Sequence, residues 1–114
     1  MERPVTESNV ELLQGTLDLL ILKALALGPL HGWAIAKRIQ QMSRDVLTVN
    51  QGSLYPALYR LQDRGMIASE PGVSPEGRKI THYKQTAAGK RQLAQRIENW
   101  ETFAAAMRNV IRYA

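Results

Sequence analysis

The sequence predicts a mainly α-helical fold with one small β-hairpin. Three observations lead to this prediction. Apolar residues recur at helical spacing in four segments, two strand-length segments flank a run of turn-forming residues, and the last helical segment contains no proline. With 114 residues, 45% of them hydrophobic, the chain suits one domain with a single core.

The composition narrows the classes of function. Fifteen Lys and Arg against ten Asp and Glu give a net charge of +5, which favours a polyanionic partner such as nucleic acid or an anionic membrane surface. The absence of cysteine excludes disulfides and thiolate chemistry, and the two histidines have no metal-ligand companions. We therefore expect no catalytic residue, no metal and no cofactor, and predict that the protein is not an enzyme.

The amino-terminal third begins with a polar stretch and continues with an apolar one. Residues 1–9 have no periodicity and are expected to form a flexible arm. A first helix, from Val10 or Thr16 to Leu27, is apolar on nearly all sides and is therefore buried by its own domain or by a partner. Lys23 and Gly28-Pro29 interrupt the most apolar segment, Leu17 to Leu30, which is too short to span a bilayer, since a span needs about 20 apolar residues. We expect a soluble, cytoplasmic protein with no membrane partner.

A second helix is predicted after His31-Gly32, where His31 either caps the helix or contacts a phosphate. Its inner face is expected to hold Trp33, Ile35, Ala36, Ile39 and Met42. A turn at residues 43–45 follows, and then a short β-prone run, residues 46–49.

The segment from Asn50 to Gly65 predicts a short helix with two unlike faces. Either Asn50 or Ser53 can cap its start, and Gly65 can end it in a left-handed conformation. The inner stripe is Leu54, Ala57, Leu58 and Leu61. The opposite side holds Gly52, Pro56, Tyr59, Arg60 and Asp63, flanked by Tyr55 and Gln62.

Residues 66–70 and 80–85 predict a hairpin across the turn-rich residues 71–77. A helix pair followed directly by a hairpin is a winged helix-turn-helix, in which the recognition helix enters the major groove and the wing contacts the adjacent backbone or minor groove. We expect residues 10–85 to form this DNA-binding domain. Residues 86–114, with Thr86 as a cap, are expected to form one long dimerisation helix.

The stretch from Gly77 to Ile97 contains six Lys and Arg but no Asp or Glu. Such a stretch is either a solvated basic face or a phosphate-binding surface, and the neighbouring recognition helix favours the second. We expect Tyr59 and Arg60 to face the bases and Ser53 to face the backbone, while Tyr55 either contacts the backbone or packs against the hairpin. The predicted DNA-binding residues are Gln51, Ser53, Tyr55, Tyr59, Arg60, Arg64, Arg78, Lys79 and Lys84.

The last helix carries a heptad seam of apolar residues with spacings of four, three, four, three and four. Its members are Leu93, Ile97, Trp100, Ala104, Met107 and Ile111, and Phe103 and Val110 widen it. The seam either packs back on its own domain or forms a two-fold dimer, and its length favours the dimer. Such a dimer would hold two recognition helices about 34–36 Å apart, one turn of DNA. The predicted dimer-interface residues are Leu93, Ile97, Trp100, Phe103, Ala104, Met107 and Ile111.

Five motifs resemble the PadR family of bacterial transcriptional regulators in their order and spacing. They are GTLDLLIL at residues 15–22, GPLHG at 28–32, NQGSLYPAL at 50–58, RG at 64–65 and YKQTAAG at 83–89. The resemblance runs from about Leu12 to Trp100. It implies a homodimeric winged helix-turn-helix repressor that binds inverted-repeat operators in double-stranded DNA and is often released by a small phenolic or drug-like molecule.

The resemblance also implies how the dimer forms and where an effector binds. The carboxy-terminal helix would cross the amino-terminal helix of the partner subunit, as in the short branch of the family. Trp100 matches a tryptophan that in some short relatives faces a cavity between subunits and stacks on flat ligands; alternatively, it only fills the seam. The wing departs from the family pattern, because Ile80-Thr81-His82 replaces a more basic run. The alternative function is a helical adaptor that uses the same fold for protein contacts without binding DNA.

Overall fold

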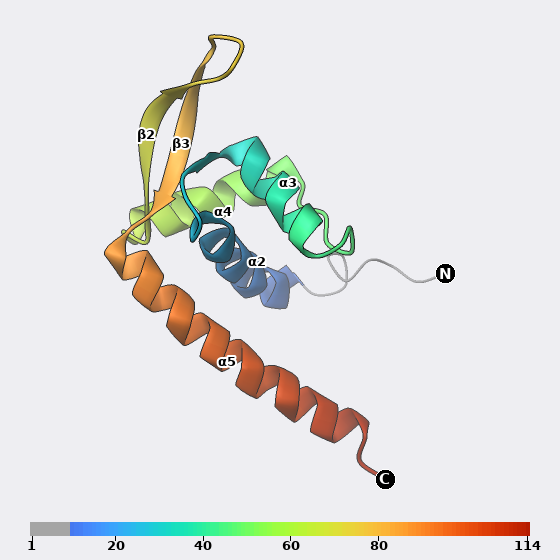
Figure 1. Ribbon diagram of the computed structural model, residues 1–114. Helices are drawn as coiled ribbons and strands as arrows, with labels where there is room; N and C mark the ends of the chain where they lie inside the picture. The colour runs from blue at the N-terminus through green and yellow to red at the C-terminus, as the bar shows by residue number, and fades with distance from the viewer. Residues whose placement is uncertain (1–9) are drawn as a thin grey trace.

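The computed structural model describes residues 10–114, so the predicted arm, residues 1–9, lies outside the described part. Within that range, four helices surround one end of a small antiparallel sheet (Figure 1). The elements, in chain order, are α2 (Val10–Leu25), β1 (Leu30–His31), α3 (Gly32–Met42), α4 (Gln51–Asp63), β2 (Ile67–Val73), β3 (Lys79–Gln85) and α5 (Ala87–Ile111). None of the described helices is long and apolar enough to cross a membrane.

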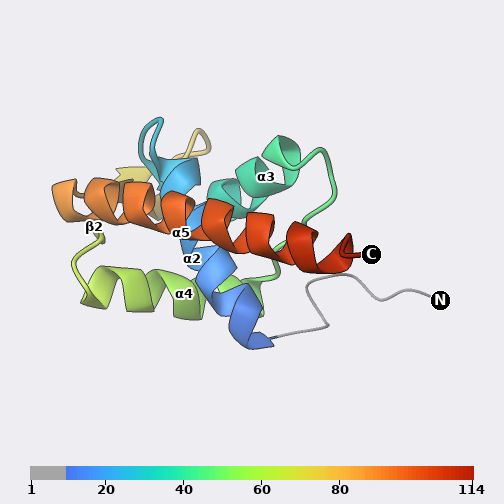
Figure 2. The same cartoon turned by 90° about the horizontal axis from the view of Figure 1, so that it is seen from below.

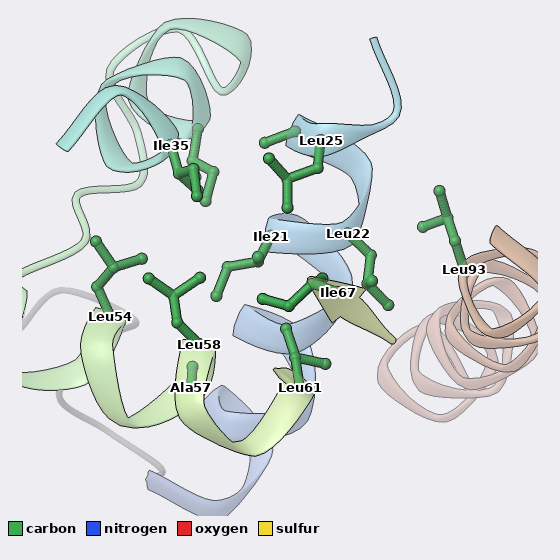
Figure 3. Close-up of a cluster of buried hydrophobic side chains, with 12 residues drawn as sticks. Ile21, Leu22, Leu25, Ile35, Leu54, Ala57, Leu58, Leu61, Ile67 and Leu93 are labelled. Carbon is green, nitrogen blue, oxygen red and sulfur yellow. The ribbon is translucent and has the colours of Figure 1, made fainter. Parts of the chain in front are cut away.

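The hydrophobic core is built around α2, as the apolar surface of that helix predicted. Ile21 and Leu22 are fully buried, and α3, α4, β2 and α5 each contribute side chains to the cluster around them (Figure 3). The buried hydrophobic residues outside α2 are Ile35, Ile39, Leu54, Ala57, Leu58, Leu61, Ile67 and Leu93. The predicted inner stripe of α4 is therefore confirmed.

Helix α3 begins at Gly32, which lies against Tyr55 of α4. A Cβ atom at Gly32 would lie 2.7 Å from the Tyr55 hydroxyl oxygen, so a larger residue there would displace the Tyr55 side chain. Trp33 is 55% exposed and stacks on His31 at the surface, and Met42 at the other end of α3 is 51% exposed. The prediction that both face the core is wrong. His31 occupies the N-cap position without a side-chain cap hydrogen bond.

The sheet has the strand order β1–β3–β2, and all its pairs are antiparallel. Besides the hairpin strands, the sheet contains β1, whose residues Leu30 and His31 pair with Tyr83 and His82 of β3. The β-prone residues 46–49 form no strand. The reason is tertiary: β1 occupies the free edge of β3, and Leu47 and Val49 pack against the core instead. Pro71 is tolerated inside β2 because β2 is an edge strand.

The structure decides which residue caps α4. The Asn50 Oδ1 atom accepts a hydrogen bond from the Ser53 backbone N–H at 2.9 Å, so Asn50 is the cap. The helix continues through Pro56, which has no N–H to donate to the Gly52 carbonyl. At the other end Gly65 has a φ of +75°, which confirms the predicted left-handed stop.

Helix α5 is joined to the end of α4 at Thr86. The Thr86 hydroxyl accepts from the Gly89 N–H at 3.0 Å and donates to the Gly65 carbonyl at 2.7 Å. Beyond this joint the helix runs away from the domain (Figure 1). The radius of gyration is accordingly 15.4 Å, whereas a compact chain of this length would have about 13 Å.

Only the first turns of α5 pack on the domain from which the helix emerges. Leu93 is 7% exposed and belongs to the core, and Ile97 packs against that core. We predicted both residues for the dimer interface. Leu93 is instead covered by its own chain, because the amino-terminal part of α5 packs across α2.

Candidate nucleic-acid interface

The polar face of α4 and the wing adjoin each other at one end of the molecule. The wing, β2 and β3, rises from the carboxy-terminal end of α4 (Figure 1). Gln51, Ser53 and Tyr59 on this face are exposed, and Tyr59 is 73% exposed. Because the opposite stripe of α4 is buried, the Tyr59 phenol is held facing solvent.

Tyr55 packs against α3 at Gly32 and also lies near Tyr83 of the hairpin strand β3. It is nonetheless 38% exposed. Burial raises the pKa of Tyr83 on β3, and negative charge on Tyr55 and Tyr59 would raise it further, so the three phenols lie close enough to interact. At neutral pH the Tyr83 phenol is therefore protonated and able to donate a hydrogen bond.

Arg60 does not project from the outer face as predicted. Its Nη2 atom lies 3.0 Å from Oδ1 of Asp18 on α2, and its side chain is 30% exposed. Arg60 lies on the flank of α4, and a buried carboxylate on the neighbouring helix draws its guanidinium inward. The helical wheel of α4 alone could not reveal that carboxylate.

The wing presents its basic residues at the tip and along β3. Arg78 and Lys79 are exposed, and the tip is closed by hydrogen bonds from the Arg78 N–H to the Ser74 hydroxyl at 3.0 Å and from the Ser74 N–H to the Arg78 carbonyl at 2.8 Å. Lys84 is exposed, and its Nζ atom lies 3.3 Å from Oε2 of Glu70 on β2. An exposed pair of this kind is weak, so Lys84 remains available to a phosphate.

The carboxy-terminal end of α4 adjoins strand β2 of the wing. Arg64, the C-cap residue, is exposed. Near the same end, the Gln62 side-chain amide donates to the Ser69 hydroxyl at 3.1 Å and so ties the helix to β2. The wing and α4 are therefore linked directly as well as through the core.

Sequence reasoning missed two clusters. Asp18 is buried between Arg60 and Arg96, and a carboxylate within the apolar run of residues 17–27 was the available signal. The second cluster lies at the base of the wing, where His31 stacks on Trp33 and meets His82 edge-on, both at 6.3 Å between ring centroids. Among residues 10–114, no three His, Cys, Asp or Glu side chains are arranged as metal ligands.

The outer half of α5 carries a row of exposed apolar side chains. Trp100 is 43% exposed, and its ring lies 5.9 Å from that of Phe103 between centroids. The other exposed large apolar residues from there to the carboxy terminus are Met107, Val110, Ile111 and Tyr113. This row continues the predicted seam past the point where the chain's own core ends.

Comparisons with known proteins agree on one family. The model of the transcriptional regulator PadR-like family matches residues 21–95. A transcriptional regulator from Mycobacterium tuberculosis is 37% identical over 75 residues, 66% of either chain. A transcriptional regulator from Clostridium thermocellum has a similar structure, with a TM-score of 0.81 and 26% identity over 90% of this chain and 99% of that one. The structure of a PadR family regulator from Eggerthella lenta is also similar, with a TM-score of 0.77 and 25% identity over 96% of this chain and 94% of that one.

Proposed function

This chain belongs to the PadR-like family of transcriptional regulators, and from that premise we propose that it is a homodimeric repressor that binds an inverted-repeat operator. The family and its structural neighbours are regulators rather than enzymes, and DNA binding follows from the family. The repressor role, the dimer and an effector are our proposals. So is the place of action, the cytoplasm, where the operator would lie.

The observation that carries the proposal is the exposed polar face of α4 beside the basic wing. Gln51, Ser53 and Tyr59 project from a helix whose opposite side is fully buried, so this face is rigidly presented. Arg78 and Lys79 lie at the exposed wing tip. We assign Tyr59 and Gln51 to base edges and the wing cations to phosphates.

The remaining predicted residues fit the same surface. Arg64 and Lys84 are exposed near the joint of α4 and the wing and are assigned to phosphates. Tyr55 is partly exposed, with its hydroxyl beside Gly32, and we assign it to a phosphate. Arg60 is engaged by Asp18, so we assign it a structural part rather than a base contact.

The apolar row on α5 supports the proposed dimer. Trp100, Phe103, Met107 and Ile111 are exposed on a helix that extends beyond its domain, and a second copy is the partner that would cover them symmetrically. Ala104 lies among them and would allow close approach. Trp100, which also stands at the start of this row, is proposed to stack on a flat aromatic effector at the dimer interface.

The proposal is tested by binding to the DNA upstream of the chain's own gene across a series of salt concentrations. Specific binding is expected to weaken steeply as salt rises, because phosphate contacts release counterions. Arg78→Ala and Lys79→Ala should weaken all duplexes together and flatten the salt slope by about one unit each. Tyr59→Phe should lower the preference for the operator over random duplex with the slope unchanged.

Two outcomes would contradict the proposal. Affinity that ignores salt, or that does not distinguish upstream DNA from random duplex, would exclude a sequence-specific regulator. A stable dimer with no footprint would favour the adaptor function instead. The effector is tested in a Trp33→Phe background, where Trp100 is the one remaining tryptophan: planar aromatics should quench its fluorescence, and a Trp100→Ala variant that binds them unchanged would remove this assignment.

A further inference from the structure

Asp18 is the one charged side chain that is buried within the described residues. It is 4% exposed and lies in α2, the helix around which the core is built. An ionised carboxylate in such a place is strongly disfavoured unless cations or hydrogen bonds surround it. Its retention in an apolar helix therefore calls for a role beyond packing.

Two arginines from two different helices meet this carboxylate. Arg60 of α4 reaches Oδ1 at 3.0 Å, and Arg96 of α5 reaches Oδ2 at 4.0 Å. Both arginine side chains are mostly covered, with 30% and 22% exposed. Asp18 thus bridges the helix proposed to enter the groove and the helix proposed to form the dimer.

The arrangement of the helices makes this bridge important. Helix α2 packs against both α4 and α5 and lies between them when the molecule is seen from below (Figure 2). Apart from Asp18, α5 is tied to the end of α4 at its own first turn, where Thr86 donates to Gly65. Arg96 stands ten residues further on, about 15 Å along the axis. Two points of attachment at that separation fix the direction of a helix, whereas one leaves a pivot.

We propose that Asp18 is a positioning residue for DNA recognition, whose carboxylate sets the angle between α4 and α5 by holding Arg60 and Arg96 at once. This inference rests on the proposed function, since it explains how a dimer through α5 would hold two α4 helices at one spacing. Leu93 and Ile97 also pack α5 onto the domain. Apolar contacts are non-directional, however, whereas an ion pair with separate oxygens for each cation specifies an orientation.

The two halves of the bridge are unequal. The Arg60 contact is a hydrogen bond, while the Arg96 contact is longer, and the buried Nε atom of Arg96 has no acceptor among the described residues. An unpaired buried donor is unfavourable, so the α5 half is the weaker half of the bridge.

The first test measures the angle without DNA. The chain has no cysteine, so Gln51→Cys and Thr102→Cys place one spin label on each helix, and dilution with unlabelled protein isolates the distance within one subunit. The doubly labelled protein in which Arg96 is unchanged should give a narrow distribution of distances between the two labels. Arg96→Met, which leaves the Asp18–Arg60 bond in place, should broaden or shift it, and Arg96→Lys should recover it.

The matched control is Arg91→Met, which removes the same charge from an exposed position of the same helix. It is expected to leave the distance distribution unchanged. Asp18→Asn serves as a second variant, since it weakens both halves of the bridge while keeping the side-chain shape. A circular dichroism spectrum and melting curve confirm that each variant is folded.

The second test uses duplexes with two half-sites at the natural separation or at one lengthened by half a turn, about 5 bp. The wild-type protein is expected to prefer the natural separation about tenfold or more, and Arg96→Met to reduce this preference to about threefold or less, with single half-site affinity retained. Arg91→Met should keep the preference.

An unchanged distance distribution in both Arg96→Met and Asp18→Asn would overturn the inference, as would equal losses of spacing preference in Arg91→Met and Arg96→Met. If the wild-type protein bound no duplex specifically, the proposed function would fail. The distance measurement would still decide whether Asp18 couples the two helices.

Discussion

Replacing Gly89 by alanine tests the joint between the wing and α5. Two physical effects predict changes of opposite sign in the free energy of unfolding. Gly89 is buried in the first turn of α5. Alanine is favoured over glycine inside a helix by up to about 1 kcal/mol. A Cβ atom at Gly89, however, would overlap the backbone carbonyl oxygen of Met66 and lie 3.0 Å from its carbon, which a side-chain rotation cannot relieve.

The magnitude follows from what the helix must do to make room. Overpacking costs about 1–3 kcal/mol. The shift would also weaken the hydrogen bond from the Thr86 N–H to the Met66 carbonyl, which measures 3.1 Å and is worth about 0.5–1.5 kcal/mol. Subtracting the gain in helix propensity leaves a net loss of about 1–3 kcal/mol in the free energy of unfolding.

The assay is urea unfolding followed by circular dichroism at one fixed protein concentration, because dimerisation would link stability to concentration. Gly15→Ala is the matched control: Gly15 also lies in a helix, but a Cβ there has no neighbour within 4 Å. It should raise the free energy of unfolding by about 0.5–1 kcal/mol. If Gly89→Ala were as stabilising as Gly15→Ala, the proposed steric role of Gly89 would be refuted.

Three further predictions concern the Asn50 cap of α4, the partly buried phenol of Tyr83 and the apolar row on α5. Asn50→Ala should lower the free energy of unfolding by about 1 kcal/mol and Asn50→Asp much less; equal effects in the urea assay would argue against the cap. Because burial raises the pKa of Tyr83, its contribution to stability is complete below about pH 10 and is lost as the pH rises through the folded-state pKa. Melting curves from pH 8 to 11 should therefore fall less steeply for Tyr83→Phe, and identical curves would contradict this assignment. Met107→Asp should weaken dimerisation by about a hundredfold or more, since it places an unpaired charge in the proposed interface. If this variant sedimented like the wild-type protein, that face of α5 would be excluded as the dimer interface.

The sequence predicted most of the local structure because its signals were local. Thr86 caps α5, Gly65 ends α4, and turn residues separate β2 from β3. The apolar stripes correctly placed Leu54, Leu58 and Leu61 in the core. Each of these features depends on neighbours within a few positions, so the chain alone contains the necessary information.

Where the predictions were wrong, the missing information was a distant partner. Residues 46–49 have β propensity but form no strand, because β1 already occupies the free edge of β3. Trp33 fits an inner helical face by spacing, yet it is exposed and packs against His31 and Lys37 instead. Leu93 belongs to a heptad seam by spacing, but α2 covers it.

For the candidate site, the sequence by itself determined the winged helix-turn-helix class, the family, and the exposed polar and basic residues of α4 and the wing. Only the tertiary structure decided how these parts are held together. Asp18 is a single acidic letter in an apolar run, and its partners Arg60 and Arg96 lie 42 and 78 positions away. Packing alone brings such charges together, and it holds Arg60 of α4 and Arg96 of α5 against the same carboxylate of α2.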